Sequence, residues 1–230
     1  NDEQQEYNHM ARVKPGELDL GSLARTDELV DELSSGQRTL AEALDRLDDI
    51  ACKPNPYPNY ITFLAFGASS GAFAMLMHTT WFDVFWSTLL GFLVYGFVFW
   101  AEKSRRVAGM LEPLSAIVAG ILAALISQYH PQINVPLVIL SSIIVFIPGL
   151  ALTLGLAELS SRDLVSGTAR IMDAIMSLFK LYFGAILGLT LASVWLGKTE
   201  FVQSTIIPDW TAWLAVGILS SSLFVIFKTR

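Results

Sequence analysis

Apolar residues gather in six long runs along the chain, and shorter polar segments separate them. The runs cover residues 60–77, 82–100, 113–128, 134–156, 169–196 and 210–227. Each is close to the ~20 residues with which an α-helix crosses a hydrocarbon layer of ~30 Å. A core helix of a soluble domain usually keeps a polar face, so runs that are apolar all round indicate lipid. The pattern predicts an all-α, polytopic membrane protein with about six transmembrane helices.

A different pattern comes before the first run. Apolar residues recur there on two helical faces, which contain Leu23, Leu29, Val30 and Leu33, then Leu40, Leu44, Leu47 and Ile50. Ser22 and Gly36 are placed to cap and to end the first helix. Thr39 and Glu42 fit a capping box that opens the second. We expect a small helical hairpin.

Charge divides the chain at the same place. Residues 1–56 contain 13 acidic and 6 basic residues, a net charge of −7, whereas residues 57–230 contain 8 and 9, a net charge of +1. We expect an acidic helical head at 1–56, a five-span membrane domain at 57–207 and a sixth span within 208–230. The acids of the hairpin are interpreted as a solvated face, with a regulatory or cation-sensing surface as the alternative.

Basic residues in the loops indicate the orientation. Those on the side of the head are Lys103, Arg105, Arg106, Arg162, Arg170, Lys228 and Arg230, and the opposite side has Lys198 alone. Loops rich in lysine and arginine stay on the cytoplasmic side of a membrane. The head and the C-terminus are therefore predicted to be cytoplasmic, in the cell (inner) membrane.

Other chemistry is sparse. The phosphate-binding pattern G-x-x-x-x-G-K-[ST] is absent, so the chain does not resemble an ATP-driven pump. His78 and His130 have no acid or cysteine at ligand spacing, and no serine has a histidine and an acid placed for nucleophilic catalysis. Cys52 is the one cysteine, which excludes an internal disulfide. We expect no enzyme activity, metal, cofactor or nucleic-acid partner.

The fourth run contains Pro148 and Gly149. Residues 134–147 would form a helix of ~21 Å before the proline interrupts its hydrogen bonds. The helix can resume at Leu150 and continue to about Ser160. Two interpretations stay open, an ordinary kinked helix or a broken helix whose free backbone groups form a transporter site.

Charged residues follow this break. Glu158 lies near the exit of the run, Asp163 can cap the next helix or pair with a nearby arginine, and Arg170 follows in that helix. Asp173 and Lys180 are seven residues apart and share roughly one helical face. Lys180 is the deepest charge, which favours a partner for a substrate carboxylate or a proton-coupled site, with snorkelling to the interface as the alternative.

Glycines predict where helices approach closely. Gly67 and Gly71 in the first run, and Gly184 and Gly188 in the fifth, have the four-residue spacing that lets helix backbones touch. Gly167 would have the same effect at the start of the fifth helix. Such spacing predicts packing and says nothing about a substrate.

Several segments resemble the threonine/serine exporter family. They are KPGELDLGSL at 14–23, TLAEA at 39–43, and IPGLALT at 147–153 followed by Glu158, Asp163 and SGTAR at 166–170. The resemblance covers nearly the whole chain from about residue 12. It implies a helical soluble stretch, about five spans and a second half of about five more, fused or separate. Residues 208–227 look like the opening helix of that half. Ala151 stands where the family often has proline, and Glu158 where it often has aspartate.

The resemblance also implies a function, namely a secondary transporter that exports small carboxylate-bearing metabolites along a gradient. Threonine or serine is the first expectation, and a dicarboxylate such as succinate is the alternative. Arg170, Lys180 and the N–H groups after Pro148 would bind the carboxylate, with Ser142 and Thr153 available for a hydroxyl.

Glu158 or Asp163 would couple protons or bind an amino group. The implied partners are the lipid bilayer, a complementary membrane half or subunit, and further copies of the chain. A competing hypothesis of another class is a non-transporting membrane interaction protein whose acidic hairpin recruits a cytoplasmic partner.

Overall fold

The computed structural model describes residues 19–52, 57–104, 109–197 and 207–228, and every regular element in these residues is helical. The elements are α1 (Leu20–Ser34), α2 (Leu40–Cys52), α3 (Asn59–Leu76), α4 (Trp81–Lys103), α6 (Leu111–Tyr129), α7 (Val135–Ser142), the 3₁₀ helix η1 (Ile144–Phe146), α8 (Gly149–Ser160), α9 (Leu164–Leu196) and α10 (Thr211–Ile226). The all-α prediction is confirmed. Residues 14–18 of the first family-like segment, and Arg105, Arg106, Lys198 and Arg230 of the orientation argument, lie outside the described residues.

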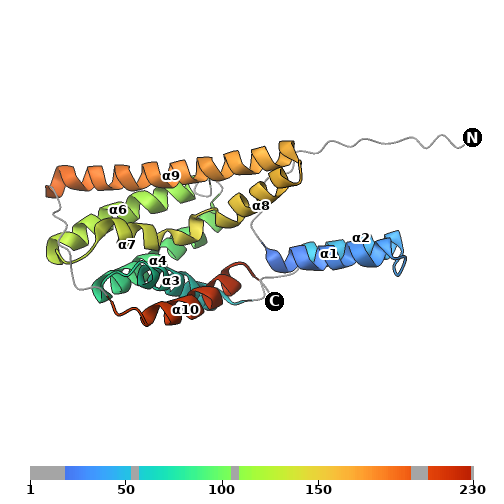
Figure 1. The fold of residues 1–230 in the computed structure, drawn as a ribbon, viewed down its shortest axis with the longest axis horizontal. Coiled ribbons are helices and arrows are strands. Elements are labelled where there is room, and N and C mark those ends of the chain that lie inside the picture. Colours follow the sequence, from blue (N-terminus) through green and yellow to red (C-terminus); the bar gives the residue numbers. More distant parts are fainter. Residues whose placement is uncertain (1–18, 53–56, 105–108, 198–206, 229–230) are drawn as a thin grey trace, which may run out of the picture. The chain divides into compact units, whose positions relative to one another are not determined.

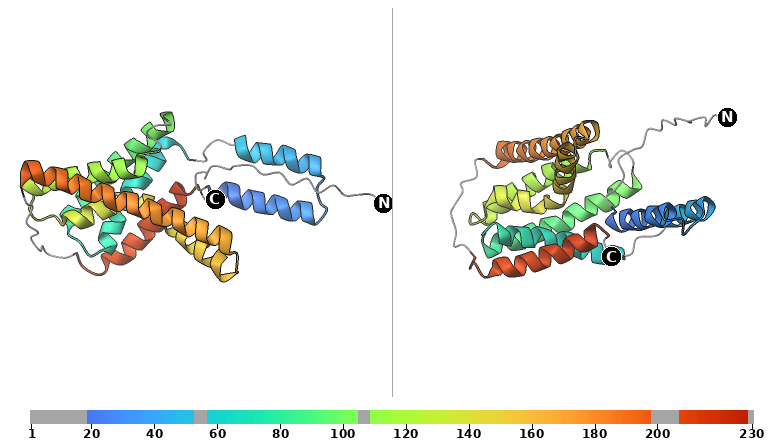
Figure 2. Two further views of the ribbon diagram at one scale, coloured as in Figure 1. Left: turned by 90° about the horizontal axis from the view of Figure 1, so that it is seen from above. Right: turned by 45° about the vertical axis from the view of Figure 1, so that its right-hand side comes forward.

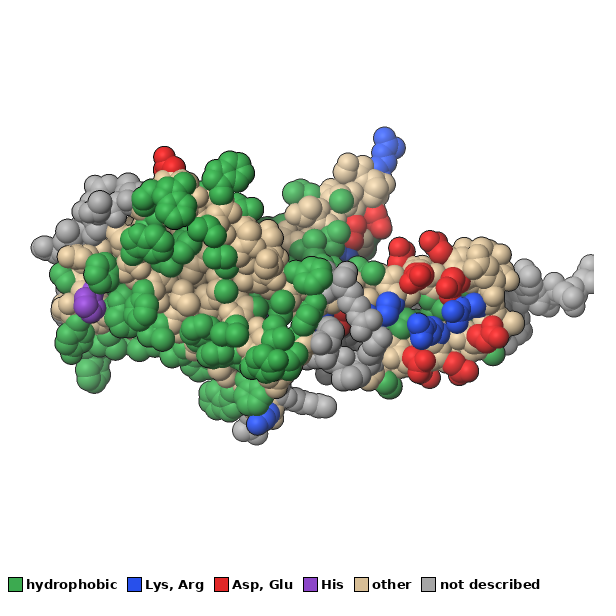
Figure 3. Space-filling model, turned by 90° about the horizontal axis from the view of Figure 1, so that it is seen from below, with side chains coloured by type: hydrophobic (Ala, Val, Ile, Leu, Met, Phe, Trp, Pro, Cys, Tyr) green, Lys and Arg blue, Asp and Glu red, His purple; other side chains and the backbone are tan. Residues whose placement is uncertain are grey.

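Two units with different surfaces make up the chain. One comprises residues 1–54 and 227–230, and the other comprises residues 55–226. Charged side chains gather on the helical hairpin of the first unit, whereas hydrophobic side chains cover much of the visible face of the second (Figure 3). An exposed surface this apolar is typical of a protein that is solvated by lipid.

The first unit contains the predicted hairpin. Asp19, and not Ser22, caps α1, because its carboxylate accepts a hydrogen bond from the Ser22 amide at 2.8 Å. The capping box of α2 is present: the Thr39 amide donates to the Glu42 carboxylate at 3.0 Å, and the Glu42 amide donates to the Thr39 hydroxyl at 3.4 Å. Gly36 lies between the helices with a φ of 73°, a conformation that suits glycine.

The core of the hairpin is smaller than its apolar pattern. It consists of Leu29, Ala43 and Ile50. The remaining apolar residues of the two predicted faces are exposed, namely Leu23, Val30, Leu33, Leu40, Leu44 and Leu47. The apolar spacing predicted the two helices correctly. Two short helices that pack only on each other do not bury all the apolar side chains of their predicted faces.

The second unit is a bundle with α7 at its centre. α9 packs on α6 and α8, α3 packs on α4 and α10, and α7 contacts α3, α4 and α6 (Figures 1 and 2). The core around α7 contains Leu90, Ala116, Ala119, Ala123, Ile133, Val135, Val138, Ile139, Ile143 and Leu181. Alanines on α6 allow the neighbouring helices to approach closely there. The shortest α-helix of the described residues is therefore also the most enclosed.

Helical segments occupy all six apolar runs, but the predicted count of six spans is not confirmed. By length and apolarity, α3, α4, α6 and α9 can each cross a membrane, and α7 with η1 and α8 adds a fifth span if the bent pair is counted as one. α10 has 16 residues, or ~24 Å of helix, which is less than the ~30 Å of hydrocarbon. The described residues therefore contain four to five candidate spans, and a sixth is not confirmed.

Gly184, Gly188 and Gly167 make the close backbone contacts that were predicted, whereas Gly67 and Gly71 pack against the side chains of Phe92 and Thr88 on α4. A Cβ atom on Gly188 would lie 2.3 Å from the Ile117 carbonyl oxygen of α6, and one on Gly184 would lie 2.7 Å from the Pro113 carbonyl oxygen. A Cβ atom on Gly167 of α9 would lie 3.0 Å from the Gly155 carbonyl oxygen of α8. Helix α9 thus touches α6 and α8 almost backbone to backbone.

Candidate functional site

The break in the fourth apolar run is the most irregular feature of the bundle. The helices before and after it are bent by 55°. The first ends at Ser142, and a 3₁₀ turn follows, so the predicted helix over 134–147 ends five residues too late. Ile147 is extended, with φ −69° and ψ 120°, as expected for a residue before proline.

Pro148 and Gly149 begin the second half of the broken run. Pro148 is the N-cap of α8, and its carbonyl accepts a hydrogen bond from the Leu152 amide at 3.0 Å. The Gly149 amide donates to the Ile147 carbonyl at 2.8 Å. A Cβ atom on Gly149 would meet nothing within 4 Å, so close packing does not require glycine there. The break separates a buried helix, α7, from a helix that contacts α9.

Glu158 and Arg170 form an ion pair between α8 and α9. The Arg170 Nη2 and Nε atoms lie 2.7 and 3.0 Å from Glu158 Oε1. The Ser166 hydroxyl donates to Glu158 Oε2 at 3.0 Å. The two charged side chains are 25% and 43% exposed, so a polar solute could reach both. Sequence spacing alone did not pair them, because the turn between the helices brings residues twelve apart together.

Lys180 has a partner that the sequence did not reveal. Its Nζ atom lies 3.3 Å from Oε2 of Glu112 at the start of α6, and the Ser177 hydroxyl donates to Oε1 of the same carboxylate at 3.2 Å. Glu112 is an isolated acid at the edge of an apolar run. An intramembrane lysine normally has an acidic partner, so the isolated position of Glu112 could have indicated that it pairs with Lys180.

The other candidates are not gathered into this arrangement. Ser142 is buried, and its hydroxyl donates to the Ile139 carbonyl at 2.7 Å; the exposed Thr153 donates to the Gly149 carbonyl at 3.0 Å. Asp163 occupies the N-cap of α9, but its side chain makes no capping hydrogen bond, and Arg170 pairs with Glu158 instead. Asp173 is exposed on α9.

A buried acid, Asp83, joins α4 to α7. It is 1% exposed and accepts hydrogen bonds from the Thr80 amide and hydroxyl, both at 2.9 Å. Its other oxygen accepts from the Asn134 amide at 2.7 Å. Since Asn134 is the N-cap of α7, this carboxylate fixes the start of the broken run. Sequence analysis missed it.

The length of α9 indicates the depth of the two ion pairs. Its 33 residues make ~50 Å of helix, more than the ~30 Å of a hydrocarbon layer. Trp195 is 89% exposed near the end of α9, where an interfacial tryptophan is expected. Counting ~20 residues back from it, we infer that Arg170 lies beyond the hydrocarbon and Lys180 about one turn inside it.

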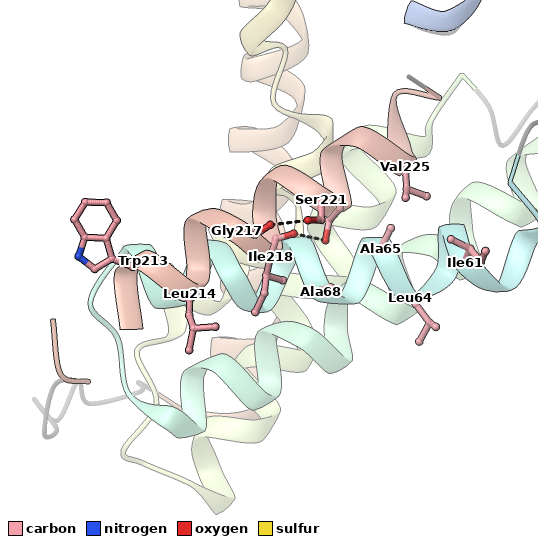
Figure 4. Close-up of a pocket in the computed structure, with 11 residues that line it drawn as sticks. Ile61, Leu64, Ala65, Ala68, Trp213, Leu214, Gly217, Ile218, Ser221 and Val225 are labelled. Atoms are coloured by element: carbon pink, nitrogen blue, oxygen red, sulfur yellow. Dashed lines mark hydrogen bonds between the residues drawn. The ribbon is translucent and has the colours of Figure 1, made fainter. Parts of the chain in front are cut away.

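Two apolar grooves open on the bundle. A groove of about 310 Å³ lies between α7 and α9 beside the break, and Ile147 and Tyr182 are among its lining residues. A groove of about 510 Å³ lies between α3 and α10 (Figure 4). Its Ser221 and Ser222 hydroxyls donate to carbonyls of α10 itself. No site residue proposed from the sequence lines either groove, and both suit acyl chains better than a charged solute.

Comparison with protein families identifies the chain. A sequence profile described as "Putative threonine/serine exporter" matches residues 1–192. The chain belongs to the threonine/serine exporter family. The expected family is thus confirmed, and a membrane exporter is the class of protein that membership supports.

Curated relatives of this family member are fungal membrane proteins. Proteins named "Pheromone-regulated membrane protein 10" are 26% identical to it in Debaryomyces hansenii, over 96% of this chain and 23% of that protein, and in Yarrowia lipolytica, over 74% and 14%. The relative of the same name in Candida albicans is 26% identical over 80% and 17%. The chain therefore spans less than a quarter of the length of these relatives. No solved structure matches the chain.

Proposed function

We propose that this chain is the membrane half of a gradient-driven exporter of threonine or serine, and that Glu158 and Arg170 receive the amino acid. The observation that carries the proposal is the half-exposed Glu158–Arg170 pair beside the broken run in a member of an exporter family. A carboxylate next to a guanidinium is complementary to an amino-acid zwitterion, because each charge of the ligand meets its opposite.

The amino acid enters by replacing the internal ion pair. Its carboxylate takes the place of Glu158 on Arg170, and its ammonium group takes the place of Arg170 on Glu158. Net charge does not change, so no unpaired charge is left at the site. A proton on Glu158 removes the acceptor for the ammonium group, so protons and substrate compete for it. Such competition is what exchange of a proton for an amino acid requires.

The spacing of the cations favours an amino acid over a dicarboxylate. Arg170 and Lys180 are ten residues apart, or ~15 Å along α9. The carboxylates of succinate are separated by two methylene groups, so one molecule does not reach both cations. Lys180 is also held by Glu112. A dicarboxylate has two negative charges to pair, and Arg170 alone would be available to it.

The same proposal includes orientation and partners. Lys103, Arg162, Arg170 and Lys228 support a cytoplasmic location for the head and the C-terminus in the inner membrane. A complementary membrane half, fused or separate, and further copies of the chain complete the transporter. The relatives' greater length agrees with the requirement for additional segments.

Efflux tests this proposal. Cells that carry the chain in its native gene are preloaded with labelled threonine, serine or succinate, and efflux is followed with and without the proton gradient. Arg170→Ala and Glu158→Gln are expected to lower threonine efflux at least about tenfold. Arg162→Ala removes a charge from the turn between α8 and α9 and is expected to leave efflux unchanged. Equal efflux from wild type and Arg170→Ala, with no gradient dependence, would exclude the transporter and favour the interaction protein.

A further inference from the structure

Three serine hydroxyls in the bundle are buried without a partner. Ser87 of α4, Ser115 of α6 and Ser141 of α7 are each 0% exposed, and their Oγ atoms make no hydrogen bond within the part of the chain that the structure describes. Nearby buried serines behave differently. The Ser69 hydroxyl donates to the Phe66 carbonyl at 2.8 Å, which is the usual solution for a serine in a membrane helix. Three unsatisfied donors in one bundle require an explanation.

Helical register places these serines toward the same seam. Ser87 lies between Asp83 and Leu90 on one face of α4; Asp83 bonds the N-cap of α7, and Leu90 packs in the core around α7. Ser141 lies three residues after the core residue Val138 on α7. Ser115 precedes Ala119, another core residue, by four positions on α6. The three serines therefore lie on the core-facing sides of α4, α6 and α7, with Ser115 fourteen residues, or ~21 Å, before the end of α6.

Polar groups mark this seam along its length. At one end Asp83 meets Asn134, and Ser87 and Ser141 follow at ~6 and ~10 Å from that contact by helical rise. At the other end Ser115 lies three residues, or ~5 Å, from Glu112 of the Lys180 ion pair.

The middle of the seam is polar as well. The Ser70 hydroxyl of α3 lies 3.5 Å from the Ser142 carbonyl at the end of α7. Ser70 also packs against Gly91 of α4, where a Cβ atom would lie 2.4 Å from its Oγ. Polar groups thus occur at both ends and in the middle of the seam, and the apolar core residues fill the rest of it.

We propose that the seam between α4, α6 and α7 is the path of a small polar solute through the bundle, and that Ser87, Ser141 and Ser115 are its hydrogen-bond donors. The path is closed in this structure, which is why their hydroxyls have no acceptor. The solute class is a molecule with carboxylate, ammonium or hydroxyl groups, so this inference rests on the proposed export function. The bend after Ser142 is the point at which the seam can open.

Single-cysteine labelling tests the path. Cys52 is the one cysteine of these 230 residues, so a Cys52→Ser background removes the thiol of this segment and provides the reference signal for labelling. In membranes, Ser87→Cys, Ser115→Cys and Ser141→Cys are exposed to a small hydrophilic methanethiosulfonate. The expected result is labelling at all three positions that threonine, serine or succinate slows several-fold. Ala123→Cys is the control, since Ala123 is 0% exposed in the same core and is expected to stay unlabelled.

Two results of the labelling would overturn the path. One is labelling at the serine positions that no solute slows. The other is equal labelling of the serine and control positions, including none at any of them. Labelling and protection are measured without transport, so they are separate from the efflux result. Absent efflux with solute-protected labelling would reject the export function and keep the path, whereas normal efflux with no labelling would reject the path alone.

A triple variant separates a path from ordinary packing. Replacing all three serines by alanine removes the unsatisfied hydroxyls and adds no volume, so the Tm is expected to stay equal or rise. If the hydroxyls bind solute, threonine efflux falls at least about tenfold in the same variant. A lower Tm, or unchanged efflux at an equal Tm, would show that the serines serve the packing of the bundle.

Discussion

The ammonium group of Lys180 lies 3.3 Å from the carboxylate of Glu112, although 68 residues separate them. This ion pair joins α6 to α9, where Ser177 also donates to Glu112. The two side chains are 43% and 30% exposed, so protein atoms enclose neither of them completely. The ion pair therefore helps to fix the position of α6 along α9, two helices that already pack closely at Gly184 and Gly188.

A double-mutant cycle measures this ion pair. Lys180→Met leaves Glu112 without its cation, and Glu112→Gln leaves Lys180 without its anion, so each is expected to destabilise the bundle. The coupling free energy between the two substitutions is expected to be about 0.5–1.5 kcal/mol, the range of polar pairs between membrane helices. Unfolding in mixed detergent gives the four stabilities. Additive effects would show that the pair contributes nothing.

Gly188→Ala tests the contact of α9 with α6. The added methyl group would lie 2.3 Å from the Ile117 carbonyl oxygen, so the helices must separate, at an expected cost of about 1–3 kcal/mol. Gly96→Ala is the matched control, because nothing lies within 4 Å of that position on α4. The control is expected to be neutral or stabilising by up to about 1 kcal/mol. Thermal unfolding of both variants checks the difference, and equal Tm values would contradict it.

Asp83→Asn tests the link between α4 and α7. An amide side chain cannot accept from Thr80 and from Asn134 with two oxygens, so one buried donor loses its partner. The expected loss of stability is about 1–3 kcal/mol. Asp163→Asn alters an exposed acid with no capping hydrogen bond and is expected to change stability by less than about 0.5 kcal/mol. Hydrogen exchange at the first turn of α7 would rise in the Asp83 variant alone.

The capping box of the head predicts a pH dependence. Hydrogen bonds from the Thr39 amide and hydroxyl, with the nearby Arg38 charge, hold the pKa of Glu42 below its ordinary value of 4.5. A carboxyl whose pKa is depressed stabilises the fold above its unfolded pKa and loses that contribution as the pH falls through the folded pKa. Exchange protection in the first turn of α2 is expected to fall below pH 4.5 in wild type. Glu42→Gln should show no such step, and a step of equal size there would assign it to another group.

Cys52 reports the side of the membrane on which the head lies. It is exposed and is the one cysteine of the sequence. A membrane-impermeant maleimide is expected to label it only after intact cells are permeabilised, because the basic loops predict a cytoplasmic head. Cys52→Ser provides the background signal. Labelling of intact cells at the permeabilised level would reverse the predicted orientation.

Local sequence patterns account for the helices of this chain. Apolar runs predicted each helix of the bundle, the Thr39–Glu42 spacing predicted the capping box, and Pro148 predicted a break in the fourth run. These features depend on residues within one or two turns of each other. The stop at Ser142 depends instead on the enclosure of α7 by three other helices, and no residue near Ser142 signals it.

The ion pairs of the candidate site were less accessible from the sequence. Arg170 and Lys180 were identified as charges that need partners, but Glu158 and Glu112 become partners only through the packing of α9 on α8 and α6. Asp83 was missed although Thr80 and Asp83 have the spacing of a capping box; only its contact with Asn134, 51 residues away, depends on helix packing. The sequence shows that a charged residue lies in an apolar segment, whereas the packing of the helices determines which residue becomes its partner.

The break after Ser142 has a mechanical consequence. α7 is anchored by Asp83 and by the core, whereas α8 is fastened to α9 where Gly155 meets Gly167. Residues 143–148 thus connect two helices that are anchored to different partners. Because α8 is held by α9, a change of the bend at these residues would move α8 and α9 together and carry Glu158 and Arg170 as one unit, while every hydrogen bond within α7 stays intact.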